Sequence, residues 1–543
     1  MSEGVVKEIL LRRGLTEADI ARYLTPDYDQ HLYDPFLMVD MEPAIERIVL
    51  AAERGEKVVV YGDYDIDGLT SSVIMKEALA YQSIDAEVYI PDRFDEGYGL
   101  NADAVRLMAD KGVNLIVTVD CGVTAMAEVR LANELGIDVV VTDHHSVPET
   151  IPEAVAVIDP KRPEDTYPFK ELCGAGVAFK VVQALQKRTG KPASGQEKWL
   201  LDLVALGTIG DVMDLLDENR VLVKYGLMVM ARTRRPGLRA LAETAGLNIA
   251  KIESTQIGFV LGPRLNAAGR MQKAGLAYEL LATTDAVRAR IIAAELEELN
   301  ARRREEQEKI FSEADDQAAQ QADAPVIVVA GADWSHGIVG IVAAKLADKW
   351  ERPVFVGQII DGKIKGSARS RGKYDIVSAL RANSELLEKF GGHFFAAGAT
   401  FDAENLEALK EGLVGYYFET ADDDNDTIDR QVDLRLNDLK LLSWDTYEQL
   451  EIMQPFGAGN PRPIFELRGI KVVRSQKLGS QGRHLKMHVA DESGRTLEGI
   501  GFNFGDMADL VENNNPVMYV DLIKNEFRGK LYLEFGIKKI DFE

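Results

Sequence analysis

Cysteine is scarce in this chain, and so are long apolar runs. Only two cysteines, Cys121 and Cys173, occur among the 543 residues. They exclude a framework of several disulfides, and their apolar or glycine-rich surroundings favour small buried core residues over reactive thiols. No apolar run is long enough to cross a bilayer, and the sequence opens without a signal-peptide pattern. We therefore expect a cytoplasmic protein that does not enter a membrane.

Basic residues are also fewer than acidic ones. The chain has 63 Lys and Arg and 88 Asp and Glu, which gives a formal net charge of −25. This balance argues against a protein that coats nucleic acid by bulk attraction. Two local basic windows nevertheless stand out in so acidic a chain, although a solvated face is the ordinary explanation of a charge run. One is a Gly/Ser-rich segment, predicted to be a loop, that holds Lys363, Lys365, Arg369, Arg371 and Lys373. The other lacks acidic residues and holds Lys471, Arg474, Lys477, Arg483 and Lys486.

The chain is too long for one hydrophobic core, so two to four domains are expected. Residues 1 to about 40 have helical periodicity but no chemical motif. Between residues 57 and 160, short apolar runs alternate with helical patterns, which predicts a doubly wound parallel sheet. Its predicted strands are 58–61, 86–90, 115–119, 139–142 and 155–158. Residues 174–245 look mostly helical, with an interruption at Gly207–Asp211.

Glycine and proline are both absent between Leu276 and Ala324. Strong helix formers fill 285–313, which predicts a long connecting helix, and its heptads are too few to favour a coiled-coil dimer. A second α/β unit is predicted from 326 to about 420. The acidic run 422–426 lacks the Gly and distal Glu of a calcium loop and is interpreted as a linker. Six short strands between 464 and 535 predict a small barrel such as an OB-fold.

Acidic residues follow three of the apolar runs of the first unit. They are Asp63, Asp65 and Asp67 after the first run, Asp120 after the second, and Asp143-His144-His145 after the third. Because ligands collect at the carboxyl ends of parallel strands, these side chains should converge. Such a cluster is stable only when a cation neutralises it.

Helix capping is the alternative explanation for Asp65 and Asp67, but one cap needs one Asp. Asp63 is a further candidate ligand. The adjacent imidazoles of His144 and His145 diverge in regular structure, so one can bind metal while the other faces substrate. Asp211 adds another carboxylate. This oxygen-rich set suits two Mn²⁺ ions, or Mg²⁺, better than structural Zn²⁺, and two such ions suit phosphoester hydrolysis.

The motifs Asp65-x-Asp67-Gly, Val-Asp120-Cys-Gly and Asp143-His144-His145 resemble those of the DHH phosphoesterase superfamily. Further motifs resemble the RecJ family of single-stranded-DNA-specific exonucleases within it. They include Leu261-Gly-Pro-Arg264-Leu-Asn266-Ala-Ala-Gly-Arg270, Trp334-Ser-His336-Gly, Gly366-Ser367-Ala-Arg369-Ser370 and Gly391-Gly392-His393-x-x-Ala-Ala-Gly398. The resemblance runs from about residue 55 to the end. One departure is Tyr61, where some superfamily members have a histidine.

The resemblance implies a 5′→3′ exonuclease of DNA repair and recombination, with metal ligands Asp65, Asp67, Asp120, His144 and Asp211 and with His145 and Asp143 as catalytic residues. It implies a DHH domain at 46–250, a connecting segment with the long helix at 251–322, a DHHA1 domain at 323–420 and an OB-fold at 428–543. The helical periodicity adds a helical segment at 1–45. The expected partners are single-stranded DNA and a single-strand-binding protein or helicase, and the expected state is a monomer. The expected contacts with the strand come from the second basic window and from Arg264, Asn266, Arg270, His336, Ser367, Arg369, Ser370, Gly391, Gly392 and His393.

Three alternatives stay open at this point. The first is a DHH phosphodiesterase for short oligoribonucleotides or cyclic dinucleotides, which has less use for a C-terminal barrel. The second is a catalytically dead scaffold of a replication assembly, which would be expected to lack some of the ligand residues. An inorganic pyrophosphatase is the third, and it has no use for a groove that holds a strand.

Overall fold

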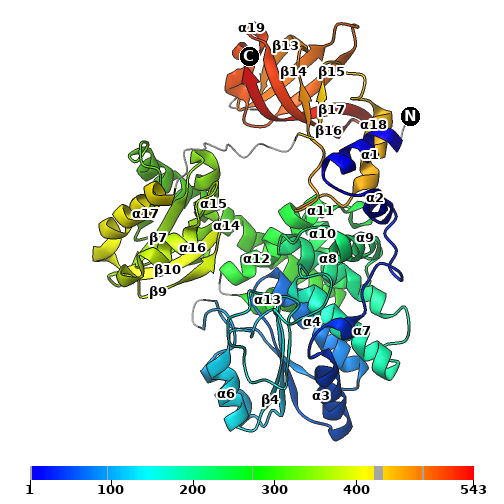
Figure 1. The fold of residues 1–543 in the computed structure, drawn as a ribbon, viewed down its shortest axis with the longest axis vertical. Helices are drawn as coiled ribbons and strands as arrows, with labels where there is room; N and C mark the ends of the chain where they lie inside the picture. Colours follow the sequence, from blue (N-terminus) through cyan, green and yellow to red (C-terminus); the bar gives the residue numbers. More distant parts are fainter. Residues whose placement is uncertain (1–2, 94–95, 272, 421–431, 480–481, 543) are drawn as a thin grey trace.

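The computed structural model describes the whole chain except residues 1–2, 94–95, 272, 421–431, 480–481 and 543. Three modules, each built on its own sheet, surround a group of helices in the middle of the molecule (Figure 1). The acidic run interpreted as a linker, 422–426, lies outside the described residues. Among the described helices, none is long and apolar enough to span a membrane.

The first module is the doubly wound parallel sheet that the sequence predicted. Its strand order is β2-β1-β3-β4-β5, and every pair is parallel. The strands are β1 Val58–Tyr61, β2 Glu87–Tyr89, β3 Leu115–Val119, β4 Asp138–Thr142 and β5 Ala156–Ile158. Helices α3 Met41–Arg54, α4 Ile66–Tyr81 and α7 Gly174–Thr189 pack on one face, while α5 Ala102–Asp110 and α6 Met126–Glu134 pack on the other.

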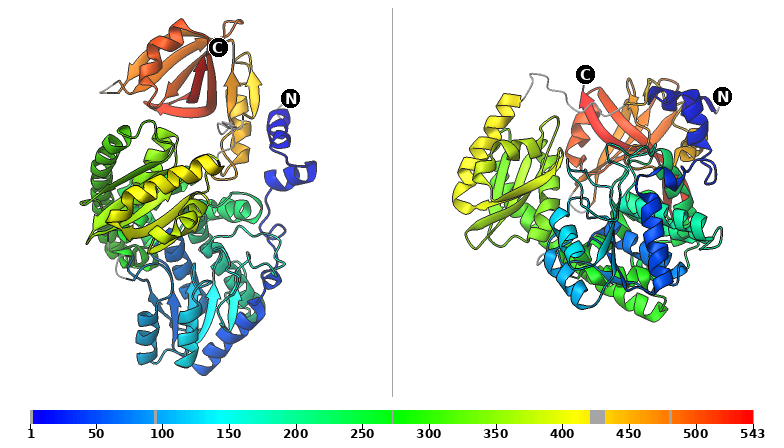
Figure 2. Two further views of the ribbon diagram at one scale, coloured as in Figure 1. Left: turned by 60° about the vertical axis from the view of Figure 1, so that its left-hand side comes forward. Right: turned by 60° about the horizontal axis from the view of Figure 1, so that its bottom comes forward.

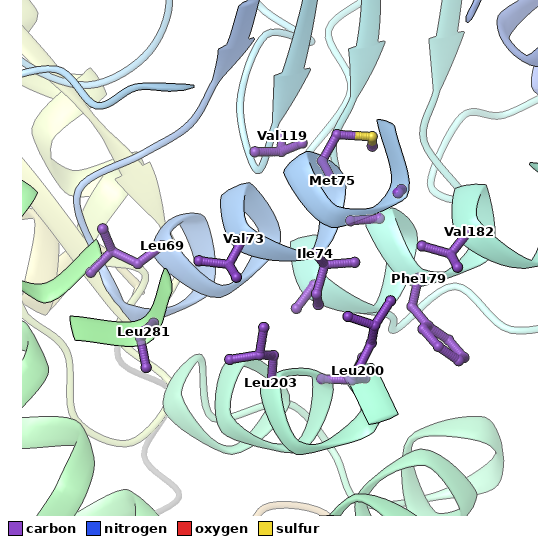
Figure 3. Packing of buried hydrophobic residues seen from close by; sticks show 14 of the residues in the cluster. Leu69, Val73, Ile74, Met75, Val119, Phe179, Val182, Leu200, Leu203 and Leu281 are labelled. Atoms are coloured by element: carbon purple, nitrogen blue, oxygen red, sulfur yellow. The ribbon is translucent and has the colours of Figure 1, made fainter. Parts of the chain in front are cut away.

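Helix α4 is buried almost all round, which fixes the position of the acidic residues at its start. Leu69, Val73 and Ile74 lie between the sheet and a second layer of helices (Figure 3). A helix with apolar residues on every side belongs in a core, and this one has almost no exposed face along its first turns. Its N-terminus is therefore held rigidly against the end of β1.

The middle helices are α8 Leu201–Gly210, α9 Asp217–Met230, α10 Pro236–Thr244, α11 Ser254–Gln256, a π-helical turn Ile257–Leu261, α12 Gly262–Arg270, α13 Ala274–Ala282 and α14 Ala286–Ala319. The predicted long helix is α14, with Asp285 as its N-cap. The predicted interruption at Gly207–Asp211 begins only at Asp211, because α8 continues through Gly207 to Gly210. The Gly207 Cα lies so close to Asp67 and Thr70 that an added Cβ would stand 2.6 Å from each side chain. Glycine is there for close packing and not to break the helix.

The second module is a mixed sheet of order β6-β7-β8-β10-β9, in which only β6 and β7 pair in parallel. Its strands are β6 Ile327–Gly331, β7 Val354–Ile360, β8 Lys363–Arg369, β9 Lys389–His393 and β10 Ala396–Asp402, with helices α15 His336–Trp350, α16 Ile376–Ala382 and α17 Leu406–Thr420. Most of the first basic window is thus not a loop: Lys363–Arg369 forms a strand whose buried residues alternate with Lys363, Lys365, Ser367 and Arg369. That period of two is the strand signal that the glycine and serine content obscured. Only Arg371 and Lys373 lie in the turn segment after the strand.

The third module is the predicted small barrel, built on a sheet of order β11-β12-β16-β17-β15-β14-β13. Its strands are β11 Leu434–Leu436, β12 Phe465–Leu467, β13 Lys471–Leu478, β14 His484–Ala490, β15 Thr496–Gly501, β16 Pro516–Phe527 and β17 Lys530–Phe542, with helices α18 Trp444–Leu450 and α19 Ala508–Asn513. In the strand order β13 and β11 are the edges, so the barrel is partly open, as OB-folds commonly are.

The N-terminal helices belong to this last module in space. Helices α1 Glu3–Arg12 and α2 Glu17–Leu24 contribute Val6, Ile9, Leu10 and other apolar side chains to the core of the barrel module. Figures 1 and 2 show them beside α18, far from the start of the first sheet. Arg13 also makes two hydrogen bonds to Asp433, at 2.7 and 3.0 Å, so the two ends of the chain form one folding unit.

Candidate metal centre and its surroundings

The acidic residues meet at the carboxyl edge of the first sheet, as predicted. Asp63, Asp65 and Asp67 follow β1, Asp120 follows β3, and His144 follows β4, while Asp211 stands directly after α8. Oxygens of Asp63, Asp65 and Asp120 lie within 4.8 Å of one another, as do ligand atoms of Asp67, His144 and Asp211. Nε2 of His144 is 3.0 Å from Oδ1 of Asp120 and 3.7 Å from oxygens of Asp67 and Asp211. Asp120 therefore stands between two adjoining ligand groups.

Backbone N–H groups hold the first two carboxylates in place. Oδ1 of Asp65 accepts from the N–H groups of Asp67 and Gly68, so this residue is the N-cap of α4. Asp67 accepts from the N–H groups of Gly174 and Ala175, at the start of α7. Asp65 is therefore a helix cap through one of its oxygens. The same carboxylate also belongs to a potential metal-ligand group.

Asp120 has a left-handed backbone conformation, with φ of +60°, which Asp tolerates better than most residues. Helix α7 approaches it closely, because a Cβ added to Gly174 would stand 2.7 Å from the Asp120 side chain. The turn after β3 and the start of α7 therefore lock the Asp120 carboxylate into one direction. Asp63, which was only a further candidate in the sequence, is 3% exposed and joins the same cluster.

The electrostatics of the cluster call for a cation. Burial and the charges of Asp67 and Asp65 raise the pKa of Asp211 to about 8, and burial together with Asp65 raises the pKa of Asp67 to about 6. Burial and neighbouring carboxylates also raise the pKa values of Asp63 and Asp120 well above the usual range. Carboxylates so close together cannot all be ionised unless positive charge is added.

His144 completes the test of whether metal fits. Burial and the neighbouring His145 lower the pKa of His144 to about 3, so its imidazole is neutral and can act as a ligand. Oδ1 of Asp120 and Oδ1 of Asp63 are buried without a hydrogen-bond partner, and so is Nδ1 of His144. An unpartnered oxygen of Asp120 that lies 3.0 Å from Nε2 of a neutral imidazole is what two ligands of one cation present. The donor set therefore fits divalent cations.

His145 lies beside the ligand groups, with ligand atoms of Asp120 and His144 within 4.8 Å, and is held by Asp143. Oδ1 of Asp143 lies 2.7 Å from Nδ1 of His145, while its other oxygen accepts from the N–H of Val123. Burial opposes the charged imidazole, but the hydrogen bond and charge of Asp143 outweigh it and raise the pKa of His145 to about 9. Tyr98, which the sequence did not single out, donates to the Asp120 carbonyl and lies 3.0 Å from Nδ1 of His145.

Comparisons with known proteins match all three modules. Residues 57–208 match the DHH family N-terminal domain, residues 323–416 the DHHA1 domain, and residues 432–539 the RecJ OB domain. The single-stranded-DNA-specific exonuclease RecJ of Bacillus subtilis is 38% identical over 98% of this chain and 67% of its own length. The Haemophilus influenzae protein of that name is 34% identical over 94% of this chain and 92% of its own length. The chain belongs to the RecJ family.

A solved structure agrees with this assignment. The crystal structure of RecJ in complex with Mn²⁺ from Thermus thermophilus covers 98% of this chain and 75% of that chain, with a TM-score of 0.84 and 31% identity. The first, second and third modules are accordingly named the DHH, DHHA1 and OB domains below. Tyr61, where some superfamily members have a histidine, donates its hydroxyl to the carbonyl of Gly99 and takes no part in the ligand groups.

The DHHA1 domain reaches the metal centre through the end of β9. Nε2 of His393 lies 3.1 Å from Oγ of Ser146, the residue after His145. Gly391 and Gly392 lie in β9 and pair with Gly398 and Ala397 of β10, so they form the end of a hairpin and not a separate glycine turn. The predicted phosphate contact at this motif therefore rests mainly on the imidazole of His393.

Cations converge between the DHH and DHHA1 domains. Burial and the charges of Arg93, Arg303 and Arg369 lower the pKa of Arg270 to about 10, and burial with Lys365 and Arg93 lowers the pKa of His336 to about 4. Cationic side chains that destabilise one another's charge form a site for an anion. We name this set the cationic cluster: Arg93, Arg270, Arg303, Lys365 and Arg369. Arg93 and Arg303 had no sequence signal, because each is a single arginine outside any motif.

Three other predicted substrate contacts have structural roles here. Arg264 donates to Glu297 of α14 at 2.5 Å and to the carbonyl of Val260. Asn266 accepts from the N–H of Ile66 and so holds the turn between Asp65 and Asp67. Ser370 donates to the carbonyl of Tyr374. Ser367 and Arg369 stand beside α15, where a Cβ added to Gly340 would approach both side chains.

The basic window of the OB domain lies on β13 and β14, with Arg483 directly before β14. Lys471, Arg474 and Arg483 are exposed, and Lys477 is 3.7 Å from Asp506. Lys486 is 2.6 Å from Glu498 of β15, so this stretch, free of acidic residues in sequence, has acidic neighbours in space. Exposed aromatic side chains on the same domain include Phe502, Phe527 and Tyr532.

Proposed function

We propose that this protein is a single-stranded-DNA-specific 5′→3′ exonuclease that hydrolyses phosphodiester bonds with two divalent cations, Mn²⁺ or alternatively Mg²⁺. The observation that carries the proposal is the buried ligand cluster. In it, Asp120 stands between one group of ligands, Asp63 and Asp65, and a second group, which consists of Asp67, His144 and Asp211. The relatives named single-stranded-DNA-specific exonuclease RecJ and the Mn²⁺ complex of the Thermus protein support it.

Two divalent cations would supply Lewis-acid activation of the phosphodiester and of water. The chain's own contribution is preorganisation, because N–H groups of α4 and α7 fix the carboxylates before any ligand arrives. Asp63, Asp65 and Asp120 would hold one ion. Asp67, His144 and Asp211, with the shared Asp120, would hold the other.

His145 is placed to act on the phosphate. Its Nδ1 is occupied by Asp143, so Nε2 is the nitrogen left for the substrate. With a pKa raised to about 9 before cations bind, the imidazole is protonated at neutral pH. It can therefore stabilise negative charge on the phosphate and donate a proton to the leaving oxygen. Asp143 is a positioning residue that fixes the ring.

The cationic cluster and His393 suit the terminal phosphate of a strand. The OB domain contacts the loop after Asp211, where the N–H of Leu215 donates to the carbonyl of Ala458 at 2.8 Å. The DHHA1 domain contacts Ser146 after His145. A strand held by the OB domain would thus cross the metal centre and end against the DHHA1 domain, with its 5′ phosphate in the cationic cluster.

The OB domain would grip the strand several nucleotides from the bond that is cleaved. Lys471, Arg474 and Arg483 offer charge, and exposed aromatic side chains offer surfaces for base stacking. We further propose that the protein acts as a cytoplasmic monomer in DNA repair and recombination, on strands exposed by a helicase or covered by a single-strand-binding protein.

One assay tests the activity and the polarity together. The protein with Mn²⁺ is incubated with single strands labelled at the 5′ or the 3′ end, with duplex DNA and RNA as competitors. We expect the 5′ label to be released as a mononucleotide at the earliest times, and the 3′ label to stay on strands that shorten progressively. Release of the 3′ label first would refute the polarity. Hydrolysis of dinucleotides alone would favour the phosphodiesterase for short oligonucleotides.

A further inference from the structure

The hairpin between β9 and β10 has an unusual tip. His393 pairs with Ala396, so the turn consists of two residues, Phe394 and Phe395. Two-residue hairpin turns favour Gly, Asn or Asp, because the turn types that match strand twist need positive φ. Neither phenylalanine is among the residues with positive φ, and Phe395 is 67% exposed. Phenylalanine is therefore unfavourable at this turn in two ways: the turn prefers other residues, and an apolar ring is exposed to solvent. A residue that is locally unfavourable is typical of a functional position.

Two backbone hydrogen bonds hold the tip, which stands beside the catalytic centre. The carbonyl of Phe395 accepts from the N–H of Ser370, and the carbonyl of Phe394 accepts from the N–H of Ile376. The two rings pack edge to face, with centroids 4.8 Å apart. The residue before them, His393, lies 3.1 Å from Ser146. Ala396, the residue after them, pairs with Arg369 of the cationic cluster.

We propose that Phe394 and Phe395 form a stacking surface for the base of the terminal nucleotide, the one released by cleavage. This inference rests on the proposed function. The cationic cluster and His393 would take the terminal phosphate, and an aromatic surface one or two residues away would lie within reach of the base attached to it. Phe395, the more exposed ring, supplies the main contact. Stacking on a flat ring is tolerant of sequence, as an exonuclease that proceeds along any strand requires.

The test compares two single strands that differ only in the 5′-terminal nucleotide, which carries either a normal base or an abasic site. We expect the wild-type protein to cleave the abasic end with about 5- to 100-fold lower kcat/KM, mainly through KM, the range typical of losing one stacked base. Phe395→Ala should lower kcat/KM on the normal strand by a similar factor and abolish the difference between the two strands. Phe395→Trp should restore the difference, whereas Phe395→Leu, apolar but without a ring, should not.

The matched control is Phe418→Ala, which removes a 70% exposed phenylalanine from α17 of the same domain. It should leave both strands unaffected. Bound Mn²⁺, measured by elemental analysis, and the temperature of thermal unfolding should be equal in the wild type and Phe395→Ala, which shows that the variant keeps its fold and its metal centre. Failure of the wild type to hydrolyse any single strand would refute the proposed function, and not only the stacking surface.

Binding supplies a readout that does not depend on cleavage. A strand with 2-aminopurine at its 5′ end, mixed with protein in the presence of EDTA, should lose fluorescence with the wild type and keep it with Phe395→Ala. A variant that still prefers the normal base over the abasic site would overturn the proposal. The same holds if Phe395→Ala changes only the oligomeric state, because the tip would then be a protein contact.

Discussion

The metal centre and the basic surface of the OB domain use charge in opposite ways. In the metal centre, buried carboxylates have fixed directions, and Asp63 and Asp120 each have an oxygen with no hydrogen-bond partner. In the OB domain, Lys471, Arg474 and Arg483 are exposed, and Lys486 is paired with Glu498. A preorganised, desolvated site concentrates its free energy in a few residues, whereas an exposed surface spreads it over many weak contacts. Substitutions should therefore have very different effects in the two regions.

The largest effect is expected from Asp120→Asn, which removes the ligand between the two groups. Outer-shell partners of a metal typically contribute about 10- to 100-fold, so loss of a shared ligand should lower kcat by more than about 100-fold in Mn²⁺. The control is Asp103→Asn, which changes a fully solvated carboxylate on α5. Turnover that stays within a few-fold of the wild type in Asp120→Asn would contradict the two-metal interpretation.

His145→Ala should reduce turnover by about 100- to 10,000-fold, the usual contribution of a general acid or base. Bound Mn²⁺, measured by elemental analysis, should stay at the wild-type level, because Nδ1 of His145 is held by Asp143 whereas Nε2 of His144 lies 3.0 Å from Asp120. His488→Ala, on the exposed surface of the OB domain, serves as the control. A drop in bound metal with unchanged turnover per ion would reverse the roles of the two histidines.

Arg13→Ala tests the joining of the chain ends. Arg13 and Asp433 are both nearly buried, and removal of one partner from such a pair typically costs about 3–5 kcal/mol. The OB domain with α1 and α2 should unfold at lower temperature in calorimetry. The control is Arg12→Ala, at the neighbouring position, which breaks an exposed ion pair with Glu8. It should lower the free energy of unfolding by at most about 0.5 kcal/mol. Equal unfolding curves for the two variants would show that the ends fold independently.

The metal-free protein should lose stability as the pH rises, with Asp211 contributing between about pH 4 and 8 and His145 between about pH 6.5 and 9. Asp211, with a pKa of about 8, and His145, with a pKa of about 9, both bind protons more tightly when folded, so the stability that they contribute is lost as the pH rises through these values. The lowered pKa of His144 acts in the opposite direction, but only below about pH 6.5. Thermal unfolding in EDTA should show the decline, and Mn²⁺ should reverse most of it. Asp211→Asn should flatten the curve.

The smallest effect is expected on the OB surface. Arg474→Ala should weaken binding to a long single strand slightly and reduce the slope of log K against log salt by about 0.7, the value for one phosphate contact. Lys486→Ala should change the slope less, because Glu498 already neutralises this lysine. Titrations at several salt concentrations distinguish the two. Deletion of the OB domain is a poorer test, because it would expose the buried side chains of Ile9 and Leu10 to solvent.

Parts of this architecture were readable in the sequence because the signals were local. Strands β1 and β3 have the predicted bounds, and the long helix covers the predicted segment. The predicted ligands Asp65, Asp67, Asp120, His144 and Asp211 do converge. The failures were also local in origin: Gly207 was interpreted as a helix break and β8 as a loop, because glycine marks both a turn and a close approach.

The sequence by itself determined which residues can carry the chemistry and that they lie at one edge of a parallel sheet. Apolar runs of strand length, each followed by acid or histidine, permit little else. Only the tertiary structure decided that Asp63 joins the cluster and that Asp143 holds His145. It also decided that α1 and α2 complete the core of the OB domain. These facts depend on burial and on contacts between residues far apart in the chain, and no local pattern records which distant surface will cover a given side chain.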